Sequence, residues 1–95
     1  MTMYNPPHPG EFIDEVYLKP LNISYGLVAE KLKVSPTTFR RLIKGQTGIS
    51  CEMALRLSIT LGRTPESWLA MQDNYNLWQA KQRLDLAGVE KLVIV

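Results

Sequence analysis

Five basic side chains lie between positions 31 and 44 with no acidic residue among them: Lys31, Lys33, Arg40, Arg41 and Lys44. The whole chain has 11 Lys and Arg against 9 Asp and Glu, a net charge of +2. Once these five are set aside, the rest of the chain therefore carries a net −3. Concentrated positive charge on a near-neutral protein is typical of binding to a polyanion, and double-stranded DNA fits best.

Two plainer interpretations of this basic cluster stay open. The charges could form a solvated helix face, or the segment could be an eroded DNA-binding motif that now contacts only protein. The second alternative explains the apolar residues of the segment equally well, but it does not explain why the charge is concentrated there.

Hydroxyl and amide side chains accompany the charges, and residues 25–44 are typical of a helix, a tight turn and a second helix. If Phe39, Leu42 and Ile43 face inward, the residues between them face outward. The first part of such a second helix points at base edges in the major groove. We therefore expect a DNA-binding set composed of Ser24, Tyr25, Ser35, Pro36, Thr37, Thr38, Arg40, Arg41, Lys44, Gln46 and Thr47.

The expected roles differ within this set. Arg41 could form two hydrogen bonds to guanine, a contact worth about 1–3 kcal/mol of discrimination. Thr37 and Thr38 could bond to bases or touch a thymine methyl group, whereas Arg40 and Lys44 lie toward the flank and suit phosphates.

Proline, glycine and hydroxyl residues divide the chain into helices, and no hairpin signal is present. Ser or Thr before a helix caps its first N–H groups, and Pro suits the first helical position. The expected helices are Pro9 to about Leu18 (ended by Pro20), Ser24 to Leu32, Ser35 to Lys44 (ended by Gly45), Ser50 to Leu61 (ended by Gly62), and Thr64 to about Leu84.

Several classes of function are not expected. The single Cys51 and single His8 cannot supply a disulfide or a zinc ligand set. The adjacent Asp14 and Glu15 offer no paired-carboxylate site, so we expect no enzyme activity, no metal and no cofactor. Residues 1–10 lack the features of a signal peptide, and no apolar run spans a membrane. We therefore expect a cytoplasmic protein.

The end of the chain departs from the helical pattern. Residues 89–95, VEKLVIV, are typical of a strand or of a short apolar tail, which could pack against the domain as an extended segment or a helix. One strand needs a partner, and a two-fold dimer could pair two of them. We expect a flexible arm at 1–8, a DNA-binding domain at 9–86 with its helix-turn-helix at 25–44, and a tail at 87–95 that is a candidate dimerisation strand.

Several short motifs outside the basic segment sharpen the prediction. With GQTGIS after it, residues 25–44 resemble the helix-turn-helix of phage-type (XRE/Cro) repressors. The wider pattern resembles the HigA (VapI-like) antitoxins, over residues 8 to about 80. It consists of His8-Pro9-Gly10-Glu11, Leu42-Ile43-Lys44-Gly45, Ile49-Ser50, Met53-Ala54-Leu55-Arg56-Leu57, Pro65-Glu66-Ser67-Trp68-Leu69 and Gln72-Asp73-Asn74-Tyr75.

This resemblance implies an all-α, five-helix, lambda-repressor-like domain that acts as a homodimer. Such a dimer would bind a palindromic operator, repress its own operon and neutralise a HigB-like toxin that cleaves mRNA. Many relatives have Gly where this chain has Lys33, so a left-handed turn there would cost about 1 kcal/mol. A phage-type repressor without a toxin partner, and a protein-interaction module that has lost DNA binding, remain as alternatives.

Overall fold

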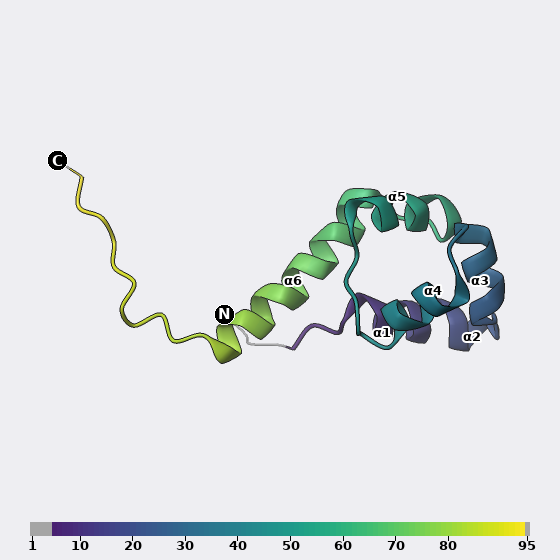
Figure 1. Cartoon of the computed structure of the whole chain (residues 1–95), viewed down its shortest axis with the longest axis horizontal. Coiled ribbons are helices and arrows are strands. Elements are labelled where there is room, and N and C mark those ends of the chain that lie inside the picture. Colours follow the sequence, from purple (N-terminus) through teal and green to yellow (C-terminus); the bar gives the residue numbers. More distant parts are fainter. Residues whose placement is uncertain (1–4, 95) are drawn as a thin grey trace.

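The computed structural model describes residues 5–94, and every regular element in them is a helix, in agreement with the predicted all-α fold; the strand considered for residues 89–95 does not form in the part described. Three contiguous segments make the first helix: α1 (Pro9–Ile13), a wider π-helical turn η1 (Asp14–Leu18) and α2 (Lys19–Leu21). Four more helices follow: α3 (Tyr25–Leu32), α4 (Pro36–Ile43), α5 (Cys51–Thr60) and α6 (Pro65–Arg83). Figure 1 shows α1 to α5 around one body, from which α6 extends.

The end of the first helix differs from the prediction, which placed it near Leu18 because of Pro20. A proline ring inside an α-helix clashes with the carbonyl four residues earlier. The π turn comes directly before Pro20 and closes with a bond five residues back, from the N–H of Lys19 to the carbonyl of Asp14. Such a turn is wider than an α-helical one, which leaves room for the ring beside the carbonyl of Val16. Pro20 is thereby accommodated, and the helix ends at Leu21 before the left-handed Asn22.

The predicted caps are confirmed for the other four helices. In each, a side-chain oxygen accepts a hydrogen bond from the N–H three residues later. The pairs are Ser24 with Leu27 at 3.2 Å, Ser35 with Thr38 at 3.1 Å, Ser50 with Met53 at 3.1 Å, and Thr64 with Ser67 at 3.0 Å.

One apolar core joins the helices. Its buried members come from α1, η1, α3, α4, α5 and α6 and from the loop before α5: Ile13, Leu18, Val28, Ala29, Leu32, Phe39, Leu42, Ile43, Ile49, Ala54, Leu57 and Trp68. Val16 and Leu27, which are also apolar and lie on these helices, are each 46% exposed. The indole N–H of Trp68 donates to the carbonyl of Gly62 at 2.8 Å, so the largest core residue is also satisfied.

The two ends of the chain differ in how they pack. At the amino end, Pro6 and His8 are buried, although the sequence assigned them to an arm; the start of that arm lies outside the described residues. At the other end, residues 84–94 form neither helix nor strand and extend away from α6 (Figure 1). Their apolar side chains are exposed, with Leu92 at 76%, Val93 at 81% and Ile94 at 84%.

Candidate nucleic-acid interface

The turn between α3 and α4 is made by a residue in a left-handed conformation. Lys33 has φ 61° and ψ 41°, and its N–H bonds to the carbonyls of Ala29 and Glu30. Its neighbour Val34 donates to Ala29 at 3.1 Å, so the turn ends α3 with paired backbone groups. The chain thus makes with a lysine a left-handed turn of the kind that glycine adopts most readily.

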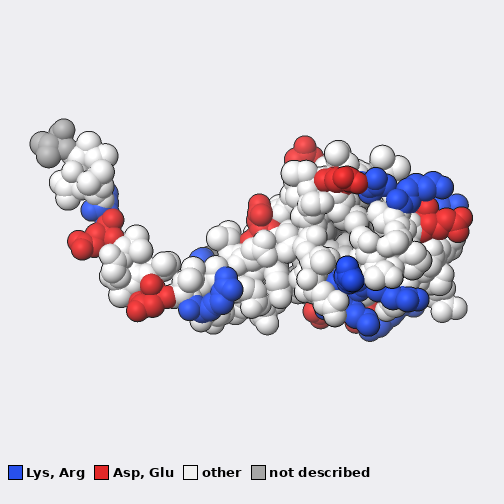
Figure 2. All heavy atoms as spheres, in the orientation of Figure 1, with Lys and Arg blue, Asp and Glu red and all other residues white. Residues whose placement is uncertain are grey.

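The packing of α4 fixes which side chains face solvent. Phe39, Leu42 and Ile43 are buried against the core, as the sequence predicts. Arg40 and Arg41, with Lys44 directly after the helix, are exposed. Figure 2 shows basic side chains gathered where α4 lies.

These three cations have no acidic partner within the described residues, where ion pairs involve only other cations. Their charge is therefore available to an external anion. This surface exists because α4 is amphipathic: its apolar residues face the core, so its basic residues face solvent.

The hydroxyl groups at the start of α4 are connected to one another. Ser35 Oγ accepts from the N–H of Thr38 and donates its proton to Thr38 Oγ1 at 2.8 Å. The hydroxyl proton of Thr38 stays available for an external acceptor. Thr37 is also exposed and is adjacent to it, and Pro36 occupies the first turn, where no N–H is needed. Ser35 is thus a cap, whereas Thr37 and Thr38 present hydroxyls.

The two residues predicted to contact phosphate at the start of α3, Ser24 and Tyr25, differ in their exposure. Ser24 is exposed and caps the helix. Tyr25 is half-buried, with its ring 6.4 Å from that of Phe39 in an edge-to-face arrangement. Its hydroxyl donates to Asp14 Oδ1 at 3.5 Å. Tyr25 therefore contacts both the first helix and a core residue of α4.

A shallow hollow of about 460 Å³ joins the start of α3 to α4, and Ser24, Gly26 and Arg40 contribute to its lining. Lys19 also lines it, and sequence reasoning missed this residue because the first helix was expected to end before it. The Lys19 ammonium contacts Glu15 at 2.7 Å, and this hydrogen bond is the main cause of its raised pKa. The same ammonium lies 3.7 Å from Asp14, so the lysine at the edge of the hollow shares its charge with two carboxylates.

The loop after α4 carries the last two predicted residues. Gln46 and Thr47 are both exposed and lie in the loop directly after the left-handed Gly45. The ring of His8 lies beneath this loop, because a Cβ atom on Gly45 would be 3.6 Å from it. His8 Nδ1 also accepts from the N–H of Gly10 at 2.9 Å, so the ring beneath the loop is held at the start of α1.

Other kinds of site have little support. Across residues 5–94, no group of His, Cys, Asp and Glu is arranged to hold a metal ion. Nor does that part of the chain contain a helix long and apolar enough to cross a membrane.

Known proteins similar to this chain share most of its length, although no family model matches it. The HTH-type transcriptional regulator YddM of Escherichia coli is 36% identical, and the match covers 98% of each chain. Virulence-associated protein I of Dichelobacter nodosus is 43% identical over 79% of this chain and 69% of its own length. Antitoxin HigA-1 of Vibrio cholerae is 33% identical over 86% of this chain and 77% of its own.

Solved structures agree with these relatives. Antitoxin GraA in complex with its operator has a TM-score of 0.87 and 33% identity, covering 100% of this chain and 98% of that one. The Pseudomonas aeruginosa antitoxin HigA with the higBA promoter has a TM-score of 0.80 and 31% identity, covering 94% and 99%. On its helix-turn-helix, its cap and core motifs and these relatives, the chain belongs to the HigA (VapI-like) family of antitoxins.

Proposed function

We propose that this protein is a sequence-specific DNA-binding antitoxin that represses its own operon and neutralises a HigB-like, mRNA-cleaving toxin. The observation that carries the DNA-binding part is the exposed basic face of α4, whose cations have no acidic partner in the described structure. Two structural relatives are described in complex with an operator or a promoter, which supports the same use of this face. Its action is stoichiometric binding, without catalysis or a cofactor, in the cytoplasm where the operator lies.

In this proposal α4 enters the major groove with its amino end toward the bases. Thr37, Thr38 and Arg41 read base edges, because they share the outer face of the helix. Arg40 and Lys44 lie toward the flanks and bind phosphates, and phosphate contacts hold the register of the protein on the duplex.

The remaining predicted residues contact the sugar-phosphate backbone of the DNA or hold the residues that do. The N–H groups at the start of α3, beside Ser24 and Tyr25, favour a phosphate at the hollow that Arg40 borders. Ser35 and Pro36 hold the start of α4, while Gln46 and Thr47 reach the backbone from the loop that follows.

We further propose that two copies act together on a palindromic operator. The division into an arm at 1–8, a DNA-binding domain at 9–86 and a tail at 87–95 is part of this proposal. The exposed apolar side chains of the tail support it, because paired strands from two copies would cover them. The two α4 helices would then read half-sites one helical turn, about 34–36 Å, apart.

A titration of the protein with a labelled fragment from upstream of its own reading frame, at several salt concentrations, tests the proposal. We expect the logarithm of affinity to fall steeply and linearly with the logarithm of salt concentration. The double variant Arg40→Ala/Arg41→Ala should lose operator binding. The matched control, Lys81→Ala/Arg83→Ala, removes the same charge from the last turn of α6 and should retain it.

The outcomes separate the three candidate functions. Operator binding that ignores salt, or that survives Arg40→Ala/Arg41→Ala, would overturn DNA recognition through α4. Co-purification with a small basic toxin but no operator binding would favour a protein-interaction module. Operator binding without any toxin partner would favour a phage-type repressor.

A further inference from the structure

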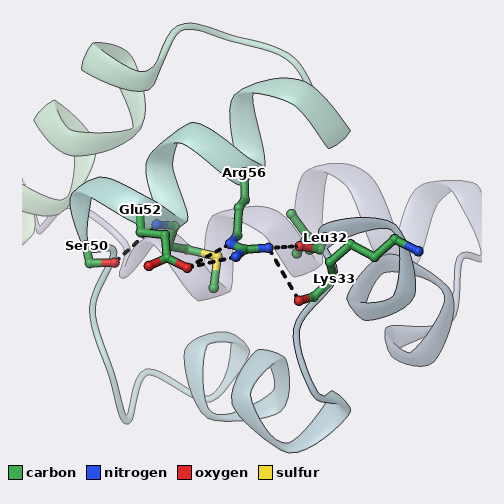
Figure 3. Close-up of polar contacts among 6 residues, drawn as sticks. Leu32, Lys33, Ser50, Glu52 and Arg56 are labelled. Atoms are coloured by element: carbon green, nitrogen blue, oxygen red, sulfur yellow. Dashed lines mark hydrogen bonds and ion pairs between the residues drawn. The ribbon is translucent and has the colours of Figure 1, made fainter.

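A side chain from α5 holds the turn between α3 and α4. Arg56 Nη1 donates to the carbonyl of Leu32 at 2.7 Å and to that of Lys33 at 3.4 Å. Figure 3 shows the guanidinium reaching from α5 to both carbonyls. Leu32 ends α3, and Lys33 is the left-handed residue that starts the turn. One arginine therefore contacts both sides of the point where the chain changes direction.

The turn has a physical need for such a partner. The last carbonyls of a helix have no N–H partner within it, and the negative end of the helix dipole favours a cation. A left-handed lysine is also less stable than a left-handed glycine. Arg56 supplies a donor and a positive charge to the last carbonyl of α3, that of Leu32. By holding the carbonyl of Lys33, it also helps to keep that lysine in its left-handed conformation.

The guanidinium is itself oriented by a carboxylate. Glu52 Oε2 accepts from Arg56 Nε at 3.0 Å and lies 2.9 Å from Nη2, so the carboxylate occupies one side of the planar group. The opposite side is left for the turn (Figure 3). Ala54 and Leu57 beside Arg56 are fully buried, which fixes the α5 backbone that carries it.

We propose that Arg56 is a positioning residue for operator recognition: from α5 it sets the turn that aims α4, without contacting DNA. This inference rests on the proposed DNA-binding function. Base contacts depend on the direction of α4, whereas non-specific binding depends mainly on charge. Loss of the Arg56 guanidinium should therefore reduce the preference for the operator more than it reduces affinity for DNA of any sequence.

Arg56→Lys is the informative variant, because it keeps the charge and the stem but cannot bridge a carboxylate and a carbonyl with one planar fork. We expect the ratio of operator affinity to random-duplex affinity to fall about tenfold, the loss expected of one misdirected base contact. Affinity for random duplex should change less than about twofold, because the charge is unchanged. An unchanged ratio would overturn the proposal.

A second substitution tests whether Arg56 acts through the turn. In the Arg56→Lys background, Lys33→Gly should restore most of the operator preference, because glycine adopts the left-handed conformation without help. Lys33→Ala removes the same charge without that freedom and should restore none. Equal behaviour of the glycine and alanine variants would also overturn the proposal.

Amide hydrogen exchange gives a measurement that does not involve DNA. In Arg56→Lys, the N–H groups of Lys33 and Val34 should exchange faster, while those in the middle of α6 keep the wild-type rate. If the wild-type protein shows no operator preference but this local change occurs, the proposed function fails, and only the hold of Arg56 on the turn between α3 and α4 is supported. If exchange at the turn is unchanged, the positioning role fails on its own.

Discussion

The side-chain oxygen of Gln72 in α6 accepts a hydrogen bond of 2.8 Å from the backbone N–H of Ile49, just before α5. Gln72 is 7% exposed and Ile49 is 6% exposed, so water cannot replace either partner easily. The amide nitrogen of Gln72 donates to Asn76 Oδ1 at 3.0 Å, which orients it. The loop that follows the proposed recognition helix is thereby fastened to the longest helix.

Replacing Gln72 by Met should destabilise the protein by about 1–3 kcal/mol, because the buried N–H of Ile49 loses its acceptor while the volume is kept. Urea denaturation measures this as a lower midpoint at unchanged slope. Asn76→Ala, at an exposed position, should cost less than about 0.5 kcal/mol. Equal losses in the two variants would mean that the bond to Ile49 is not the source of the effect.

Gly10 of α1 lies directly against the backbone of α4. A Cβ atom there would lie 1.8 Å from the carbonyl oxygen of Leu42 and 2.8 Å from Ile43 Cα, both backbone atoms that cannot turn aside. Gly10→Ala should therefore displace α4 and cost about 3 kcal/mol, measured by thermal or urea unfolding. Gly26→Ala is the matched control, because its Cβ would meet nothing within 4 Å. In a helix that change should stabilise by about 0.5–1 kcal/mol.

Stability should fall at mildly acidic pH because of His8. Burial lowers its pKa below the ordinary value of 6.5, although the backbone of Thr47 and the charge of Glu11 partly oppose this. Besides Glu11, the titratable group against the ring is Tyr75, whose ring centroid is 4.9 Å away. The folded protein thus binds fewer protons than the unfolded chain, so this contribution is complete above pH 6.5 and is lost as pH falls through the folded-state pKa.

The measurement is urea unfolding between pH 5 and pH 8, compared with His8→Asn. Asparagine keeps a side-chain acceptor for the N–H of Gly10 but does not titrate in this range. The acid-induced loss should be smaller in the variant. An identical pH dependence in both proteins would assign the loss to other groups.

The sequence predicted the parts of this structure that depend on neighbours along the chain. Ser35 and Pro36 start α4 as expected, and the phase set by Phe39 and Leu42 leaves the basic residues outside. The continuation of the first helix past Pro20 could not be predicted, because the π turn that permits it has no distinct sequence signal.

Contacts between distant residues were also beyond prediction. Arg56 lies 24 residues from Leu32, and Gln72 lies 23 from Ile49. In the sequence, Arg56 and Gln72 are polar residues within motifs on two predicted helices, and neither motif indicates which distant residue its side chain contacts. Lys19 was missed for a related reason, since its place beside the hollow depends on the unexpected helical extension.

Arg41 and Lys44 should differ in how they affect DNA recognition. Arg41→Ala should weaken binding to the operator by about 1–3 kcal/mol and relax the preference at one base position, because a guanidinium fork reads guanine. Lys44→Ala should weaken all sequences alike and reduce the salt slope by about 1. Titrations against single-base operator variants distinguish them. A uniform loss in Arg41→Ala would assign that residue to phosphate contact instead.

Removal of residues 87–95 should produce a folded monomer. The described part of the tail contributes nothing to the core, and Leu92, Val93 and Ile94 are more than three-quarters exposed, so the helical body should retain its unfolding midpoint. Apolar strand residues are covered only if they pair, and a second copy supplies an identical edge. Light scattering should therefore report the mass of one chain for the truncated protein and of two for the intact one. The truncated protein should also bind the operator more weakly, because a monomer contacts one half-site whereas a dimer contacts two linked ones. If the truncated protein keeps the mass of two chains, the dimer contact lies in the helical body and the tail is left for the toxin.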